Sequence, residues 1–452
     1  MDETDQGGTA SERHSLSGEL EQIAFDPADA KASLIQLPQS AAVFALFGAE
    51  AHTEPYIGRT PNLRGRLERL LQPSEKHPRR LQLAGRVRRI AFRLTGSDFE
   101  SLLLQFEMLQ EVYGPKCLER MHLGSPSFVR FLGGNAYPRI TVTNKPSTRQ
   151  ADWSYGPFQS RASAERFADE ALKLFLLRRC TEDLDPNPSH PGCVYSEMKM
   201  CLAPCYQGCT DERYADEAGA VERFLATRGE SRLVTLRTER DQASAQLEFE
   251  TAAALHAQVQ RVETVRALAP ELVRPLSQLR AVILQTAASL DAVAVFVYEN
   301  GRLRGPALFS TLGMRIQNEQ SGSSSLFAQP VALEPVPENR DQGLDIPLSS
   351  TSETSSIGIA AQETAPSKLA RGVLEARLDA ALCALEERSK AGSATVRQGH
   401  LALLKRWYYR PEARRTGEIF FPDAEGRWPV KAILRGVGRV FVARFKGMAA
   451  DS

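Results

Sequence analysis

The pattern of hydrophobic and polar positions predicts a compact α/β unit near the start of the chain. Apolar or alternating runs indicate strands, and amphipathic runs indicate helices: strands at 41–47, 55–58 and 86–94, helices at 61–71 and 97–112. Pro61 suits the first turn of its helix. Ser97 followed by Glu100 predicts a capping box at the start of the second helix. The predicted order is therefore β-β-α-β-α.

The same pattern continues downstream with mixed elements. We expect strands and loops over 128–158, a helix at 162–178, mostly helices over 211–270, a β-hairpin over 283–313, a helix at 368–391, and a helix followed by short strands over 400–446. The turn of the hairpin is placed at Glu299-Asn300-Gly301. No internal repeat of fixed period is visible.

These elements predict a multidomain α/β protein. Its expected parts are a leader (1–38), an α/β module (39–120), a linker with a cysteine cluster (121–210), a helical region (211–275), a β-rich segment (276–315), a linker (316–370) and a small α+β region (371–452). The leader is acidic and polar, and the linker at 316–370 is rich in Ser, Gln and Pro, so both are expected to be disordered.

Charge is nearly balanced over the 452 residues, with a formal net charge of +1. A nucleic-acid surface must therefore be local, and 59–93 provides one candidate with eleven basic residues against Glu68 and Glu75. The eleven are Arg59, Arg64, Arg66, Arg69, Lys76, Arg79, Arg80, Arg86, Arg88, Arg89 and Arg93. We expect them to contact DNA phosphates with little sequence preference, although a solvated face is the simpler alternative.

No apolar run approaches the length of a membrane span, and the polar start of the chain is unlike a secretory signal. A cytoplasmic protein without membrane contact is expected. Five of the seven cysteines fall between 180 and 209, which favours a metal site over disulfides. The spacing Cys180-x12-Cys193-x7-Cys201-x3-Cys205 suits zinc or an iron–sulfur cluster, and it does not choose between them. Cys209 is a spare ligand or a free thiol.

Several motifs in order resemble a known family. AVFALFG…PYIGRTPNLRGRL…SDFESLLLQFEMLQEVYGPK is similar to the GIY-YIG nuclease domain. It is followed by YGPFQS, LFLLRRC, PGCVYSEMKMCLAPC and LEFETAAAL, as in the N-terminal half of UvrC. The short relative Cho shares the longer loop of the hairpin. The family's RNase-H-like second nuclease and helix-hairpin-helix motifs have no visible counterpart.

The resemblance assigns roles to particular positions. It implies that Tyr56 and Arg66 are retained catalytic residues and that Arg59 replaces a lysine. The family's first tyrosine is here Phe44, and its metal-binding glutamate falls on Gln105. Other departures are the aromatic or histidine position at Leu70 and the closing asparagine at Leu118; an alternative alignment puts Phe106 at the glutamate position.

These departures predict a defective cutting site. A GIY-YIG enzyme needs Mg²⁺ or Mn²⁺ held by a carboxylate, and the amide oxygen of Gln105 is a weaker ligand. Glu100 and Glu107 are on the same helix but should point away from Gln105. Losing one catalytic group commonly costs about 10²–10⁴-fold in rate. The alternative is an active endonuclease that makes one incision near lesions.

The resemblance also implies a cofactor and a partner. Cys180, Cys193, Cys201 and Cys205 match the family's [4Fe–4S] ligands, with zinc the alternative. Residues 236–266 resemble the UVR motif, a helical hairpin that docks on UvrB, with Leu247, Phe249, Ala252 and Ala253 as expected contacts. The family's Arg-Asp after this run is His256-Ala257 here. An intramolecular helix pair is the simpler alternative.

The C-terminal stretch from His400 holds Trp407, Tyr408 and Tyr409 among basic residues. Such aromatics can stack on unpaired bases, but packing in a small core is the more common role, and we expect it here. The function expected from the whole sequence is that of a UvrC-type repair protein that binds double-stranded DNA and a UvrB-type partner. An iron–sulfur redox sensor on a former nuclease frame is a weaker possibility.

Overall fold

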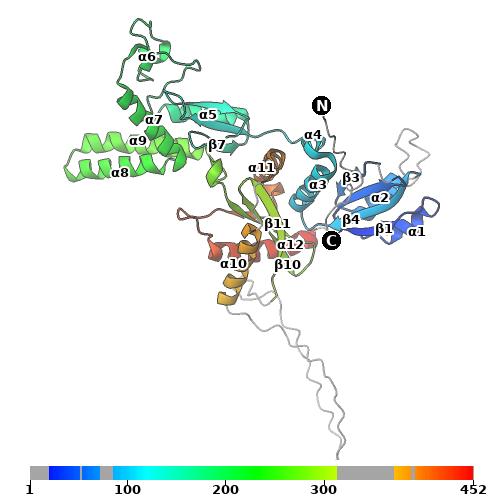
Figure 1. Ribbon diagram of the computed structural model, residues 1–452. Coiled ribbons are helices and arrows are strands. Elements are labelled where there is room, and N and C mark those ends of the chain that lie inside the picture. The colour runs from blue at the N-terminus through cyan, green and yellow to red at the C-terminus, as the bar shows by residue number, and fades with distance from the viewer. Residues whose placement is uncertain (1–19, 51–52, 72–84, 313–370, 388–391, 451–452) are drawn as a thin grey trace, which may run out of the picture.

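The computed structural model describes residues 20–50, 53–71, 85–312, 371–387 and 392–450. In these residues the chain is mixed α/β, as predicted, and contains three four-stranded antiparallel sheets. We call them the module sheet (order β1-β4-β2-β3), the middle sheet (β6-β5-β7-β8) and the central sheet (β11-β10-β9-β12). Figure 1 shows the central sheet between the blue N-terminal module and the green helices. None of the described helices is long and apolar enough to cross a membrane.

The predicted β-β-α-β-α order is confirmed. It comprises β2 (Ala42–Gly48), β3 (Tyr56–Thr60), α2 (Leu63–Leu71), β4 (Val87–Leu94) and α3 (Asp98–Tyr113), followed by the short helix α4 (Cys117–Arg120). The Ser97 hydroxyl caps α3 by accepting a hydrogen bond from the amide of Glu100 at 3.1 Å. The Glu100 carboxylate instead accepts from the amide of Gly96 at 2.8 Å, so only half of the predicted capping box forms.

Residues 20–38 are not a disordered leader, and that prediction is wrong for this stretch. Strand β1 (Glu21–Ala24) pairs with β4 at the edge of the module sheet, and helix α1 (Ala30–Ile35) follows it. Phe25, Leu34 and Leu37 are buried against the sheet in the cluster that also contains α2. These three side chains order the segment despite the polar residues around them, because burial stabilises each apolar side chain by about 1.5–3 kcal/mol. Residues 1–19 lie outside the described residues.

The middle part of the chain packs helices on a second sheet. Its elements are β5 (Ser127–Leu132), β6 (Arg139–Thr143), β7 (Asp152–Phe158), α5 (Arg161–Leu172), α6 (Val194–Glu197), α7 (Asp211–Ala226), α8 (Glu230–Ala245), α9 (Phe249–Ala267) and β8 (Arg274–Pro275). Helix α5 ends before the predicted limit at 178, and the chain continues as non-helical backbone in which Phe175 and Leu177 are buried. The three long helices α7, α8 and α9 confirm the helical prediction for 211–270.

The central sheet is covered on both faces. It consists of β9 (Ala281–Thr286), β10 (Ala292–Glu299), β11 (Arg302–Ser310) and β12 (Glu418–Phe420). Helices α10 (Arg371–Glu387) and α12 (Val430–Ala450) cover one face, whereas α3 and α11 (Ala394–Tyr408) cover the other. The predicted turn joins β10 to β11, and positive φ angles of 50° at Asn300 and 78° at Gly301 fit the Asn-Gly preference of such hairpins.

The prediction of short strands near the C-terminus is wrong apart from β12. Residues after 430 form the long helix α12, whose buried side chains include Ile433, Val437 and Phe441. Their spacing of three to four residues is helical, but the valines and glycines between them resemble a strand and its turns. The predicted linker at 316–370 lies outside the described residues.

The module and the central sheet share one hydrophobic core. It contains Ala45 of β2, Phe106 of α3, Phe296 of β10 and Trp407 of α11. The Thr286 hydroxyl donates to the carbonyl oxygen of Gly96 at 2.5 Å, at a point where a Cβ on Gly96 would lie 2.0 Å from the Ala287 backbone. Segments expected to be separate are therefore in direct contact.

Candidate nuclease-like centre and cysteine pocket

Phe44 and Tyr56, where the resemblance places two tyrosines, lie side by side. Phe44 is buried in β2, in the cluster with Leu63 and Leu67 of α2. Tyr56 begins the edge strand β3 and is 41% exposed. Their ring centroids are 6.1 Å apart. The structure therefore brings both positions together on the α2 side of the module sheet, but only Tyr56 carries a hydroxyl group.

Gly58 and Arg66 complete this side of the sheet. Gly58 pairs with Phe44, and a Cβ on Gly58 would lie 2.8 Å from Phe44 Cζ, so the ring packs directly on the glycine backbone. Arg66 is half-buried on α2. Among the described residues it has no ion-pair partner. Leu70, at the family's aromatic or histidine position, packs against the apolar cluster below α2.

Gln105 is on α3, which covers the opposite face of the module sheet, with Val43 and Ala45 in its core. The helix runs alongside β3, and the Tyr113 hydroxyl donates to the carbonyl oxygen of Pro55 at 2.8 Å. Gln105 is half-buried, whereas Phe106 is fully buried in the core. Gln105 is therefore the better of the two candidate positions for a group that reaches a metal.

A carboxylate that the sequence reasoning missed shares the Gln105 side of α3. Asp98 lies seven residues earlier, which is about two turns and a rotation of roughly 20°. It accepts hydrogen bonds from Arg59 and, at 2.5 Å, from Arg410 Nη2. Partial burial would raise the pKa of Asp98, but the Arg410 hydrogen bond and the Arg59 charge hold it below the usual value. Arg59 is thereby directed towards α3.

Two other acidic residues of α3, Glu100 and Glu107, have different surroundings. Glu100 is buried and bound to the amide of Gly96, and burial raises the pKa of its carboxyl group. Glu107 lies within electrostatic range of Arg93 on β4 and of Arg302 on β11. The expectation that Glu100 and Glu107 point away from Gln105 agrees with these surroundings.

The described basic residues of 59–93 are divided between the two faces of the module sheet and α2. Arg88 and Arg89 are consecutive in β4, so their side chains leave opposite faces of the sheet. Arg89 donates to Gln22 Oε1 at 2.9 Å, and Arg88 donates to two carbonyl oxygens beside it. Arg64 donates to the carbonyl oxygen of Leu37 at 2.7 Å, whereas Arg86 is exposed. Lys76, Arg79 and Arg80 lie outside the described residues.

The four predicted cysteine ligands line one pocket. Cys180, Cys193, Cys201 and Cys205 surround it, and Cys209 does not. All four are free thiols. In the described part of the chain, no group of three or more His, Cys, Asp or Glu side chains is placed to hold a metal ion. The four predicted residues therefore line one pocket without being arranged as metal ligands, and Cys209 is not part of its lining.

Hydrogen-bond donors point at two of these sulfur atoms. Arg178 Nη1 donates to Cys180 Sγ at 3.5 Å, and the amide of Ala203 donates to Cys201 Sγ at 3.3 Å. Burial raises the pKa of Cys201 to about 11, so this thiol is protonated in the metal-free protein. Arg178 is itself buried and held by the carbonyl oxygen of Tyr137 at 2.9 Å. Sequence reasoning missed Arg178, although it stands two residues before Cys180.

Comparison with known proteins identifies this middle region. Residues 128–224 match the family model of the UvrC/Cho excinuclease middle domain. The chain is UvrC-like. It is 27% identical over 285 residues to UvrABC system protein C of Alcanivorax borkumensis, covering 63% of this chain and 46% of the relative. For the same protein of Ruminiclostridium cellulolyticum the identity is 28% over 302 residues, or 66% and 48% of the two chains. No solved structure matches.

The UvrC-like chain spans less than half the length of these relatives. The match over about three fifths of the chain confirms the resemblance seen in the motifs, and it includes the cysteine pocket and the helices α5 and α7. The match to the middle-domain family does not extend to Phe44, Tyr56 or Gln105.

In this UvrC-like chain the UVR-like segment is an antiparallel hairpin of α8 and α9. Its tip holds Leu247, with a φ of 63°, and Phe249. These side chains are 72% and 66% exposed. Ala253 is also exposed and Ala252 is half-buried, while Val259, Val262 and Val265 further along α9 are buried. The hairpin is thus anchored at its base and presents apolar side chains at its tip.

The aromatic tail of the UvrC-like chain packs internally, as expected. Trp407 is buried, and its Nε1 donates to the carbonyl oxygen of Thr416 at 3.1 Å. The Tyr409 hydroxyl donates to the carbonyl oxygen of Pro157 at 3.0 Å. Tyr408 is partly buried against the same core. These rings hold the C-terminal region to the rest of the molecule.

Proposed function

We propose that this chain is a UvrC-like nucleotide-excision-repair protein that binds DNA and a UvrB-type partner, and that its GIY-YIG centre does not hydrolyse DNA. The observation that carries the proposal is the buried ring of Phe44, which stands beside the retained Tyr56 where the family has a second hydroxyl group. The relatives are named as members of a UvrABC system, which supports a role in excision repair.

The surroundings of α3 support the absence of cutting. Metal-assisted hydrolysis needs a carboxylate that holds the divalent ion. Gln105 offers a neutral oxygen, and Asp98 on the same side is occupied by Arg59 and Arg410. Each missing catalytic group costs about 10²–10⁴-fold in rate, so the loss of two leaves little activity.

An active divalent-metal-dependent endonuclease is the alternative. It is supported by the exposure of Tyr56 and by Arg66, which among the described residues has no acidic partner and remains free to contact a phosphate. In that case Mg²⁺ or Mn²⁺ would bind near Gln105.

The decisive experiment measures nicking of a lesion-bearing duplex in Mg²⁺ and in Mn²⁺, with and without a UvrB-type partner. We expect no nicking by the wild-type protein and a gain of at least about 10²-fold in the double variant Phe44→Tyr, Gln105→Glu, because both groups that the chemistry needs are restored. Nicking by the wild-type protein that Arg66→Ala abolishes would contradict the proposal and favour the alternative.

We also assign the cysteine pocket to a [4Fe–4S] cluster. Four thiols around one pocket match the ligand number of such a cluster, and N–H donors at two sulfurs are the kind of contact that tunes it. The cluster would hold the long loop between α5 and α7 in place. Binding must displace the thiol protons, which makes it depend on pH.

Anaerobically purified protein should contain iron and acid-labile sulfide, and Cys201→Ser should lose both. Cys209→Ser is the matched control, because Cys209 stands outside the pocket and should leave the metal content unchanged. Zinc without sulfide in the wild-type protein would exclude the cluster and establish the zinc alternative.

A further inference from the structure

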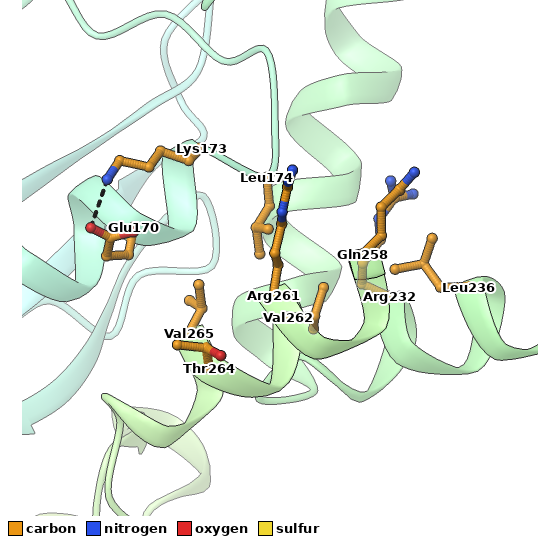
Figure 2. A pocket seen from close by; sticks show the side chains of 10 residues that line it. All are labelled: Glu170, Lys173, Leu174, Arg232, Leu236, Gln258, Arg261, Val262, Thr264 and Val265. Atoms are coloured by element: carbon orange, nitrogen blue, oxygen red, sulfur yellow. Dashed lines mark hydrogen bonds and ion pairs between the residues drawn. The ribbon is translucent and has the colours of Figure 1, made fainter. Parts of the chain in front are cut away.

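A pocket of about 460 Å³ lies between α5 and the α8–α9 hairpin, outside the centres described above. Figure 2 shows its lining, with Arg232, Gln258 and Arg261 extending to the same side of the hairpin. Leu174, Leu236 and Val262 contribute an apolar floor. The size falls within the range of ligand sites, about 300–1,000 Å³.

The rim of this pocket is strongly cationic. Three basic side chains, Lys173, Arg232 and Arg261, line it together with one carboxylate, Glu170. Glu170 is bound to Lys173 at 2.7 Å, so it is already engaged on its own helix. Among the described residues, Arg232 and Arg261 have no ion-pair partner.

Neighbouring arginines on the same hairpin behave differently. Arg237 pairs with Glu263 at 2.8 Å, and Arg266 pairs with Glu230 at 3.0 Å. Carboxylates of α8 and α9 therefore neutralise the arginines beside the pocket, whereas the two arginines that line the pocket have no carboxylate partner among the described residues. Two guanidinium groups without carboxylate partners, together with the amide of Gln258, are suited to binding an anion.

We propose that this pocket binds phosphate groups of a DNA strand. The inference rests on the proposed function, because it takes DNA to be a ligand of the chain. Guanidinium groups match phosphate oxygens in a two-pronged geometry, and the Gln258 amide is a further polar group of the lining. The apolar floor suits the sugar of the same strand. The site extends the DNA-binding surface from the module to the helical hairpin.

DNA fits these observations better than an acidic protein segment. Most of the described arginines of 59–93 are held by carbonyl oxygens or carboxylates, or lie on different faces of the module sheet. Few of the described cations of the module are therefore free for phosphates, and further phosphate contacts elsewhere on the molecule are needed for a long DNA-binding surface. The three cations come from separate elements, because Lys173 follows the last residue of α5, Arg232 is on α8 and Arg261 is on α9, and such a spread suits contacts with successive phosphates.

The test compares two double variants of the full chain, with its metal centre loaded, by fluorescence anisotropy of a fluorescein-labelled duplex and of the corresponding single strand over a series of NaCl concentrations. Arg232→Gln, Arg261→Gln removes the pocket cations. Arg166→Gln, Arg223→Gln removes equal charge from exposed positions of α5 and α7 outside the pocket. We expect the pocket variant to reduce the slope of log K against log salt by about 2, and the control to leave it unchanged.

Thermal unfolding of each variant shows whether it is folded, and Arg232→Lys, Arg261→Lys should retain the wild-type salt slope because it keeps both charges. Equal slopes for wild type and pocket variant would overturn the inference while leaving DNA binding by the chain intact. A pocket variant that binds DNA normally but loses a UvrB-type partner would overturn it in favour of an acidic protein ligand. Failure of wild type to bind either DNA would contradict the proposed function as well.

Discussion

The surroundings of His400 determine its protonation state. It is 1% exposed on α11, its Nδ1 accepts a hydrogen bond from the amide of Leu303 at 2.9 Å, and its ring packs edge-on against Phe106. Burial lowers the pKa of His400 to about 3, and the charges of Arg302 and Arg304 act in the same direction. The native protein therefore keeps this imidazole neutral.

This arrangement predicts a pH-dependent stability. The unfolded chain protonates His400 near pH 6.5, whereas the folded chain does so only near pH 3. The stabilisation is complete above pH 6.5 and is lost as the pH falls towards 3, by up to about 1.4 kcal/mol per pH unit. We expect His400→Asn, which keeps an acceptor but does not titrate, to unfold with less dependence on pH over this window. Urea unfolding at each pH measures this, and an equal pH dependence of the free energy of unfolding in wild type and variant would contradict the assignment.

For single residues, the sequence predicted some members of the candidate nuclease-like centre and missed others. Phe44 and Gln105 were visible as departures from a motif, because the motif fixes their positions along the chain. The contact of Asp98 with Arg410 was not visible, since 312 residues separate the two. Spacing along a helix or strand predicts neighbours within one element, and it carries no information about a partner that the tertiary fold supplies.

Among the elements, α11 and α3 approach each other closely at Gly399. A Cβ on Gly399 would lie 2.2 Å from Phe106 Cζ, and Phe106 is buried. Glycine within a helix normally costs about 1 kcal/mol relative to alanine. Here its absence of a side chain is what lets the two helices touch.

Two Gly→Ala variants should therefore have opposite effects. Gly399→Ala should destabilise the protein by about 1–3 kcal/mol, because the added methyl group overpacks the contact with Phe106. Gly438→Ala, in the middle of α12 with no atom within 4 Å of the added Cβ, should stabilise it by up to about 1 kcal/mol. Thermal unfolding of both variants measures the difference, and a shift of the same sign in each would refute this account of α11.

The elements were predictable where the period of the pattern was clear. The alternation in β4 and the capped start of α3 located both elements correctly. The strand β1 and the helix α12 were missed for different reasons. Strand β1 is short and lies in a polar segment, so its stability comes from pairing with β4 rather than from its own residues. In α12, β-branched residues and glycines obscured a helical period.

For the molecule as a whole, the exposed tip of the α8–α9 hairpin is the feature most directly suited to a partner. The base of the hairpin belongs to the middle core, so the tip is held at a fixed place on the molecule (Figure 1). Exposed large apolar side chains of this kind commonly mark an interface. On the proposed function, the partner is a UvrB-type protein.

The double variant Leu247→Ser, Phe249→Ser should weaken binding to a UvrB-type protein by roughly 10-fold or more, because two apolar contacts of about 1 kcal/mol or more are lost. Val234→Ser on α8 is the control, since Val234 is 55% exposed but lies away from the tip. Isothermal titration calorimetry measures both affinities. Equal weakening by the tip variant and the control would indicate that the tip is not the docking surface.

The pairing of β12 with β9 has a consequence for how the protein is made. Ribosomes add about 5–20 residues per second, so residues 418–420 are synthesised on the order of ten seconds after β9. During that interval one edge of the central sheet lacks its final strand, and the helices α10 and α12 do not yet cover its face. An open edge next to an apolar face favours aggregation. The nascent chain is therefore expected to need chaperones until its last quarter has emerged.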